Sequence, residues 1–166
     1  SYTLIRDLFI FCTFTGLSWM DMANLTQANL QTSFDGHLWL NTNRQKTGVE
    51  TNIRLLDVAK HIIEKYRDMA PDGKLLPVPC YNNCKNSIKA IAKRCDIEKN
   101  VTWHTARHTY ATTICLMNGV SLETLSKMLG HKRITTTQTY AKVTQPMIDR
   151  EVEMLKEKLA DKFMAV

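Results

Sequence analysis

Residues 104–143 read HTARHTYATTICLMNGVSLETLSKMLGHKRITTTQTYAKV, and their spacing predicts three helices, over about 104–118, 121–129 and 134–140. The pair Asn118-Gly119 is typical of a helix end and separates the first helix from the second. This part of the chain is therefore expected to be a bundle of short helices.

The same stretch groups side chains suited to phosphoryl transfer, namely Arg107, three histidines (His104, His108 and His131) and Tyr140. A guanidinium presents a planar fork of donors that matches two phosphate oxygens, and histidines beside it can donate hydrogen bonds or move protons. A tyrosine oxygen can attack phosphorus and store the bond as an ester. The pattern indicates a site that acts on a phosphate group.

Upstream and downstream, the pattern predicts more helices and one small sheet. The expected helices cover residues 2–14, a short helix through Met20, Ala23 and Leu25, a segment capped by Asp57 and running to Met69, one from Asn82 or Asn83 to Cys95, and one from Pro146 to near Met164. Turn signals at Asp35-Gly36 and Thr47-Gly48 separate three expected strands, at about 28–33, 38–45 and 49–55. The predicted fold class is α+β, mainly α-helical, with a three-stranded antiparallel sheet in one domain over 1–166.

Composition narrows the class of protein further. The 22 Lys and Arg outnumber the 16 Asp and Glu, and the net charge of +6 is compatible with a polyanionic partner. No apolar run is long enough to cross a membrane and no signal peptide is evident, so we expect a cytosolic location. The five cysteines are scattered and odd in number, which predicts reduced thiols rather than a disulfide framework.

The stretch at 104–143 resembles the C-terminal signature of the tyrosine recombinase, or phage integrase, family. In that family the HxxR motif supplies a histidine and an arginine, here His104 and Arg107, and LGH supplies a histidine, here His131. The tyrosine nine residues later, here Tyr140, is the nucleophile. Thr15-Gly16-Leu17 is similar to the family's TG(L/M)R box, and Lys46 matches the lysine of its β-hairpin, so the resemblance covers nearly the whole chain.

One departure concerns the first catalytic arginine, because Ser18 occupies its place. Asp21 keeps the acidic position that supports that arginine in the family. The FTGLS box resembles that of integrases of conjugative transposons from gut anaerobes, and this resemblance implies that Ser18 is a subfamily trait. Loss of a charged donor would cost on the order of 10²–10³ in rate. Our hypothesis is that Arg6 or Arg133 supplies the missing charge.

The resemblance implies a metal-independent enzyme without a cofactor that cuts double-stranded DNA. Tyr140 would form a 3′-phosphotyrosine intermediate, and Lys46 would protonate the leaving 5′ oxygen. The family works as a homotetramer on DNA, with the C-terminal helix docked in trans, whereas the isolated domain can be a monomer. The family's N-terminal core-binding domain is expected to be missing from residues 1–166. The implied role is integration and excision of a mobile element in a bacterial, nucleoid-associated setting.

Several residues have a simpler interpretation beside the functional one. The three histidines could hold a metal, although the HExxH glutamate of zinc helices is absent. His108 could be structural or could support the site, and Lys46 could be a solvated turn residue. A basic row on one helix could be a solvated face or contact the DNA backbone: Lys85, Lys89, Lys93 and Arg94. An apolar stripe could pack on this chain's own core or on a partner: Ile148, Val152, Leu155, Leu159 and Phe163.

Two other functions remain compatible with the sequence. A type IB topoisomerase uses the same kind of chemistry to relax one strand at a time, but the full set of TG, HxxR and LGH motifs favours a recombinase. A DNA-binding regulator that kept the fold and lost activity is the second alternative, and Ser18 is the feature that supports it. A covalent adduct on DNA with a nick would distinguish an enzyme from a regulator.

Overall fold

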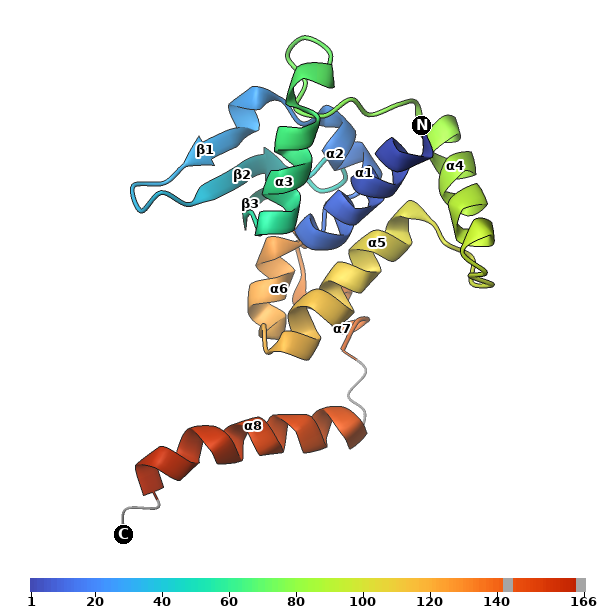
Figure 1. The fold of residues 1–166 in the computed structure, drawn as a ribbon. Coiled ribbons are helices and arrows are strands. Elements are labelled where there is room, and N and C mark those ends of the chain that lie inside the picture. Colours follow the sequence, from blue (N-terminus) through green and yellow to red (C-terminus); the bar gives the residue numbers. More distant parts are fainter. Residues whose placement is uncertain (142–144, 164–166) are drawn as a thin grey trace.

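The computed structural model describes residues 1–141 and 145–163 and confirms the predicted fold class (Figure 1). Most elements are helices, and one three-stranded antiparallel sheet has the order β1-β2-β3. The helices are α1 (Tyr2–Thr15), α2 (Trp19–Asn24), α3 (Asp57–Lys65), α4 (Tyr81–Arg94), α5 (Trp103–Thr109), α6 (Leu122–Met128), α7 (Ile134–Gln138) and α8 (Gln145–Phe163), and the strands are β1 (Leu30–Thr32), β2 (Leu38–Asn43) and β3 (Glu50–Arg54).

Helix α1 is the centre of the main body and packs against α3, α4 and α5. Its buried side chains include Leu8, Phe11 and Cys12, which are completely inaccessible to solvent. Apolar residues at helical spacing produce this buried face, because every third or fourth side chain points to the same side. The core therefore fixes the end of α1, where the TG box begins.

The sheet forms as predicted but with shorter strands. Leu40 on β2 pairs with Leu30 and Ile53 in an antiparallel register, and Leu40 and Ile53 are buried. The first expected strand, at 28–33, is reduced to β1 because a 3-10 turn at Gln27–Asn29 precedes it. The turn between β2 and β3 carries Lys46, as expected.

Three predicted helix boundaries were wrong. Asp57 does not cap α3, since Leu56 is the N-cap and Asp57 lies in the first turn, and a separate 3-10 turn follows at Arg67–Met69. Helix α4 begins at Tyr81 after Cys80, ahead of the asparagines. The helix expected over 104–118 divides into α5, a π-helical segment at Tyr110–Cys115 and a 3-10 turn at Leu116–Asn118. The hydroxyl of Thr112 bonds back to the carbonyl of His108, a contact that favours bending of a helix.

Helix α8 lies apart from the rest of the chain in Figure 1. Four members of its predicted stripe are exposed: Ile148 (44%), Val152 (53%), Leu155 (53%) and Leu159 (39%). The side chain of Phe163 and the predicted helix end at Met164 fall outside the described residues. The four exposed residues do not pack on this chain's own core. Within the described part of the chain, the helices are too short or too polar to cross a membrane.

All five cysteines are free, as predicted, and Cys12, Cys84 and Cys115 are buried.

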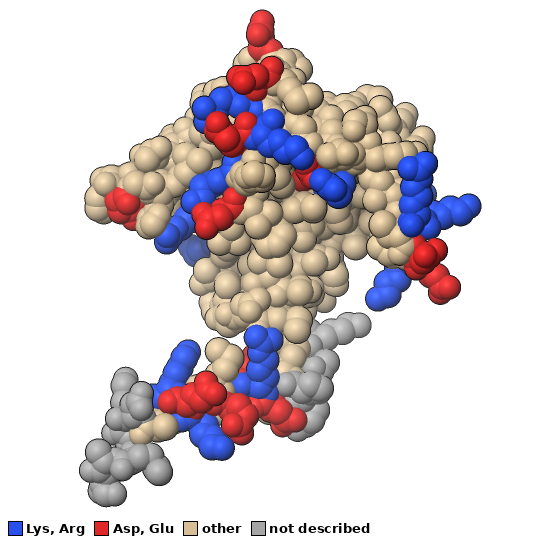
Figure 2. All heavy atoms as spheres, viewed as in Figure 1, with Lys and Arg blue, Asp and Glu red and all other residues tan. Residues whose placement is uncertain are grey.

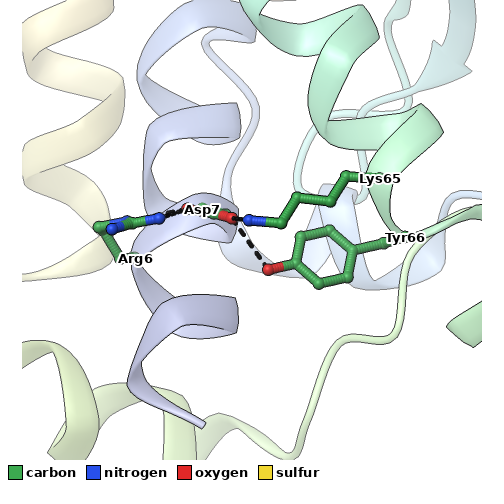
Figure 3. A network of polar contacts seen from close by, with 4 residues as sticks. All are labelled: Arg6, Asp7, Lys65 and Tyr66. Atoms are coloured by element: carbon green, nitrogen blue, oxygen red, sulfur yellow. Dashed lines mark hydrogen bonds and ion pairs between the residues drawn. The ribbon is translucent and has the colours of Figure 1, made fainter.

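A polar network ties α1 to α3 (Figure 3). The carboxylate of Asp7 is only 5% exposed and accepts hydrogen bonds from Arg6, from Lys65 Nζ (2.6 Å) and from the Tyr66 hydroxyl (2.9 Å). Burial alone would raise the pKa of Asp7, but these donors hold the pKa below its usual value. Arg6 therefore has a structural partner on the same helix.

We expect Asp7→Asn to lower the free energy of unfolding by about 1.5–3 kcal/mol at pH 7, because charge-assisted hydrogen bonds to a buried carboxylate are lost. Because the pKa of Asp7 is lower in the folded than in the unfolded chain, its carboxylate stabilises the fold at pH values above the unfolded-state pKa of about 4. This contribution is lost as the pH falls through the folded-state pKa. The gap between wild type and variant should then narrow in acid. Urea denaturation at several pH values measures this difference in the free energy of unfolding, with Asp57→Asn, at an exposed position, as the control. A difference that does not change with pH would contradict the stabilising role of the Asp7 carboxylate.

Candidate active site

The guanidinium of Arg107 is the best-anchored group of the candidate site. It is 3% exposed, and it donates from Nη1 to the carbonyl oxygen of Gly16 (2.5 Å) and from Nη2 to that of Leu129 (2.6 Å). Nη2 also contacts Nε2 of His131 at 3.2 Å. Arg107 thus joins α5 to the end of α1 and to the loop between α6 and α7.

Two glycines permit these close approaches. Gly16 has φ +73°, and a Cβ there would meet the ring of Tyr110, while Gly130 has φ +63°, and a Cβ there would lie 2.7 Å from Cγ2 of Thr51. Other residues rarely adopt this backbone conformation. The glycines of the TG and LGH motifs therefore let the two backbone segments pack closely around Arg107.

His131 lies between Arg107 and the short helix α7. Its Nδ1 is 2.7 Å from the hydroxyl of Thr137, a side chain that is fully buried. Burial lowers the pKa of His131, and the charges of Arg44 and Lys46 lower it further. The imidazole is therefore neutral at pH 7 and lies close to the cations of Arg107, Arg44 and Lys46.

Tyr140 follows α7 and packs into the same site within one chain. Its ring is stacked on that of His131, with centroids 6.4 Å apart, and lies 5.3 Å from the ring of His108. Burial raises the pKa of the Tyr140 phenol, while the charge of Arg44 acts in the opposite direction. The ring of Tyr140 therefore has two histidine rings as neighbours.

Arg44 is a site residue that the sequence analysis missed. Its Nη1 donates to the carbonyl oxygen of Leu129 at 3.0 Å, the same oxygen that accepts from Arg107. Its Nε is buried and has no hydrogen-bond partner among the described residues. Burial lowers the pKa of Arg44, and the carboxylate of Asp21 opposes this change. Two guanidinium groups therefore lie side by side, and one still has an unmet donor.

Ser18 and Asp21 support the turn that carries Arg44. The hydroxyl of Ser18 donates to Asp21 Oδ2 (2.6 Å) and accepts from the Asp21 backbone N–H, which caps α2. Asp21 Oδ1 accepts from the backbone N–H of Gln45 at 2.9 Å. Asp21 on α2 therefore holds the turn between β2 and β3, and its charge acts on the neighbouring Arg44.

Lys46 and His104 lie at the edges of the site. Lys46 is exposed, and its neighbour Thr47 donates from its hydroxyl to the carbonyl oxygen of Gly130 at 3.0 Å, which holds the turn over the LGH loop. His104 is also exposed and, with Arg107, lines a pocket of about 340 Å³ whose wall includes Trp19.

The two arginines proposed to replace the missing one lie on α1 and just before α7. The guanidinium of Arg6 donates to Asp7 on its own helix, in the network of Figure 3. Arg133 is exposed and is the residue before α7. Within the described residues, no group of three His, Cys, Asp or Glu side chains is arranged to hold a metal ion.

The basic row on α4 is exposed, whereas Cys84 and Ile88 form the buried face of this helix. Figure 2 shows blue side chains on the surface where α4 lies in Figure 1. Arg94 stacks over the ring of Tyr2, 4.6 Å from its centroid. Lys89 and Lys93 border a surface hollow of about 510 Å³, whose lining also includes Lys99, Asp96 and Glu98. Lys85 is exposed on the same helix.

Comparison with protein families gives a match over most of the chain. The model described as "Phage integrase family" matches residues 2–147. The tyrosine recombinase XerD of Oceanobacillus iheyensis is 33% identical over 118 residues, which cover 60% of this chain and 38% of that protein. The integrase of Escherichia phage P2 is 31% identical over 136 residues, which cover 82% of this chain and 37% of that protein. The chain spans less than two-fifths of the length of these two relatives.

Solved structures share the fold. XerA recombinase superimposes with a TM-score of 0.72 at 21% identity, covering 92% of this chain and 56% of that one. The Tn1549 transposon integrase, solved in complex with a circular intermediate DNA, gives a TM-score of 0.64 at 21% identity, covering 89% of this chain and 57% of that one.

We expect Gly130→Ala to destabilise the chain by more than Gly36→Ala. Both glycines have positive φ, but a Cβ at Gly36 meets nothing within 4 Å, whereas one at Gly130 meets Thr51. Both variants lose about 1–2 kcal/mol of stability because alanine disfavours positive φ. Only Gly130→Ala adds a steric clash. Thermal denaturation of the two variants checks this, and equal losses would contradict it.

Proposed function

We propose that this chain, which belongs to the phage integrase family, is the catalytic domain of a site-specific DNA recombinase that cuts and rejoins strands through Tyr140. The carrying observation is that Tyr140, His131, Arg107 and Arg44 converge within one chain. Two guanidiniums and a phenol at one place suit a phosphodiester substrate.

The proposed reaction begins with a DNA phosphate bound by Arg107 and Arg44. The Tyr140 oxygen gives its proton to a neighbouring histidine, His108 or His131, and attacks phosphorus, and the bond from phosphorus to the 5′ oxygen breaks. Lys46 gives that oxygen a proton, which leaves a 3′-phosphotyrosine and a free 5′ hydroxyl. The two guanidiniums stabilise the charge that develops on the non-bridging oxygens, and no metal ion is assigned to this role. His104 is a further donor at the edge of the phosphate position.

The reverse reaction needs no energy source, because the ester keeps the energy of the broken bond. A 5′ hydroxyl of the same strand restores the duplex, and one from a second duplex gives a recombinant strand. The Tn1549 integrase bound to a circular intermediate DNA supports double-stranded DNA as the partner and a mobile element as the setting. We place the protein in the bacterial cytoplasm, associated with the nucleoid.

The exposed stripe of α8 supports an assembly role. A stripe of apolar side chains that is not covered by its own chain indicates a partner surface. We propose that α8 docks in trans on a neighbouring copy within a homotetramer on DNA, and that the domain by itself is a monomer. The basic row of α4 would contact the DNA backbone, and its contribution to binding should fall with added salt.

The position of Arg44 weakens the hypothesis that this chain is a DNA-binding regulator without activity. That hypothesis depended on Ser18 in place of the first catalytic arginine. Because Arg44 brings a guanidinium next to Arg107, the site keeps two arginines and an active enzyme is favoured.

We expect the chain to form a denaturant-resistant adduct with nicked suicide duplexes whose sequence around the nick is randomised. Tyr140→Phe should abolish the adduct, since the nucleophilic oxygen is removed, and Arg107→Ala should reduce it strongly. Gel electrophoresis after denaturation detects the adduct, and sequencing of the trapped DNA shows which sites are selected. An adduct that persists in Tyr140→Phe would overturn the nucleophile assignment.

Arg44→Ala is expected to slow adduct formation on the order of 10²–10³-fold, as for the loss of one transition-state donor. Arg44→Lys should restore part of the rate, since it keeps the charge but not the fork of donors. The matched control is Arg6→Ala, which removes a guanidinium outside the site. Single-turnover cleavage measures all three, and a normal rate in Arg44→Ala would exclude its role.

Lys46→Ala should slow cleavage of ordinary DNA, but not of DNA with a 5′-bridging sulfur at the scissile bond. A thiolate leaves without protonation, so the substrate bypasses a missing general acid. Parallel single-turnover rates on the two substrates give the comparison. An equal defect on both would show that Lys46 has another role.

A further inference from the structure

An aromatic pocket lies beside the candidate active site, and the reaction proposed above gives it no role. Its volume is about 340 Å³, and two of its lining residues, His104 and Arg107, belong to the site. The rest of its wall consists of Ser18, Trp19, Met20, Tyr81 and Trp103. The three aromatic residues are the first residues of α2, α4 and α5, so the starts of three helices meet beside Arg107.

Contacts between rings hold the wall of the aromatic pocket in place. The rings of Trp19 and Tyr81 meet edge to face with their centroids 5.0 Å apart, and the ring of Trp103 meets that of Phe9 on α1 at 5.7 Å. Trp103 is buried, and its indole N–H has no hydrogen-bond partner among the described residues. The wall is therefore anchored in the core and contains one donor that this part of the chain does not use.

The rim of the aromatic pocket exposes apolar surface. Met20 is 52% exposed and Tyr81 is 46% exposed, although both lie beside the polar groups of the candidate site. Apolar and aromatic walls with a few polar groups are typical of pockets for small ligands, whose volumes are roughly 300–1,000 Å³. At the lower end of that range, this pocket is suited to a single planar ring system.

The proposed reaction brings a ligand of this kind to the pocket. A phosphate bound by Arg107 is joined to a nucleoside on each side, and Arg107 also lines the pocket. A strand that joins a second duplex must unpair from the one that it leaves, and unpaired bases stack readily on aromatic side chains. A base next to the scissile phosphate is therefore a planar group that strand exchange makes available beside this pocket.

We propose that the aromatic pocket binds a base next to the scissile phosphate while that base is unpaired, by stacking it on Tyr81 and Trp19. The proposal rests on the function proposed above. These rings take no part in bond breaking. They offset the cost of unpairing, so that the strand is held away from its first duplex while it is exchanged.

The first test uses suicide duplexes of a site selected in the adduct assay. The base on each side of the scissile phosphate, in turn, is paired, mismatched or replaced by an abasic analogue. A mismatched base is already unpaired, and loss of its stacking corresponds to about 5- to 150-fold. We expect Tyr81→Ala to lower the second-order rate of adduct formation on the mismatched duplex by this factor. Tyr81→Phe should restore most of the rate, because it keeps the ring.

The abasic duplex separates stacking from a general effect on the fold. It has no base to stack, so wild type and Tyr81→Ala should react with it at the same rate. Met20→Ala should also slow the reaction of the mismatched duplex, and the matched control is Met69→Ala. Met69 is exposed like Met20 but lies outside the pocket. Thermal denaturation shows whether each variant is folded.

A second measurement does not need cleavage. Tyr140→Phe protein is irradiated with duplexes that carry an unpaired iodouracil, and the crosslinked peptides are identified by mass spectrometry. We expect crosslinks at Trp19 or Tyr81. Crosslinks found only outside the pocket would overturn the proposal, as would a defect of Tyr81→Ala that is equal on mismatched and abasic duplexes. If wild type forms no adduct at all, the proposed function fails, and the crosslinks alone decide whether a base enters the pocket.

Discussion

The carbonyl oxygen of Leu129 is the contact on which the site depends, because it accepts from two guanidiniums, those of Arg44 and Arg107. Two cations placed together in a partly buried site repel each other, and a fixed acceptor between them offsets part of that cost. The charge of the Asp21 carboxylate also stabilises the guanidinium of Arg44. An anion placed against both guanidiniums would offset more of that cost, which supports the phosphate position proposed above.

The backbone around that oxygen explains why the motifs have glycines at fixed places. The LGH glycine follows Leu129 directly, and its positive φ turns the chain so that His131 comes next to Arg107. The TG glycine lets the end of α1 approach the ring of Tyr110. These residues carry no chemistry, but they bring three separate segments of the chain to one guanidinium.

Much of the fold could be predicted from the sequence, because its helices and strands follow from apolar spacing and turn residues. The site motifs could also be recognised, because each of them is a short local stretch of sequence. The importance of Arg44 could not be predicted, since it comes from a tertiary contact with Leu129, far away in the sequence. Arg6 was chosen by proximity in the sequence, but its carboxylate neighbour Asp7 engages it. The division of the helix after α5 into π-helical and 3-10 turns escaped prediction because apolar spacing does not report local changes of helical pitch.

The packing of Tyr140 against His108 and His131 of its own chain has a consequence for how an assembly would be organised. Under the proposed function, every subunit would hold its own nucleophile and both arginines. Mixing a subunit that lacks Tyr140 with one that lacks Arg107 would then restore activity to neither, and neighbouring subunits would act through contacts that shift the α7 turn rather than by donating a side chain. Neighbours in such a complex would govern timing and leave the chemistry to each chain.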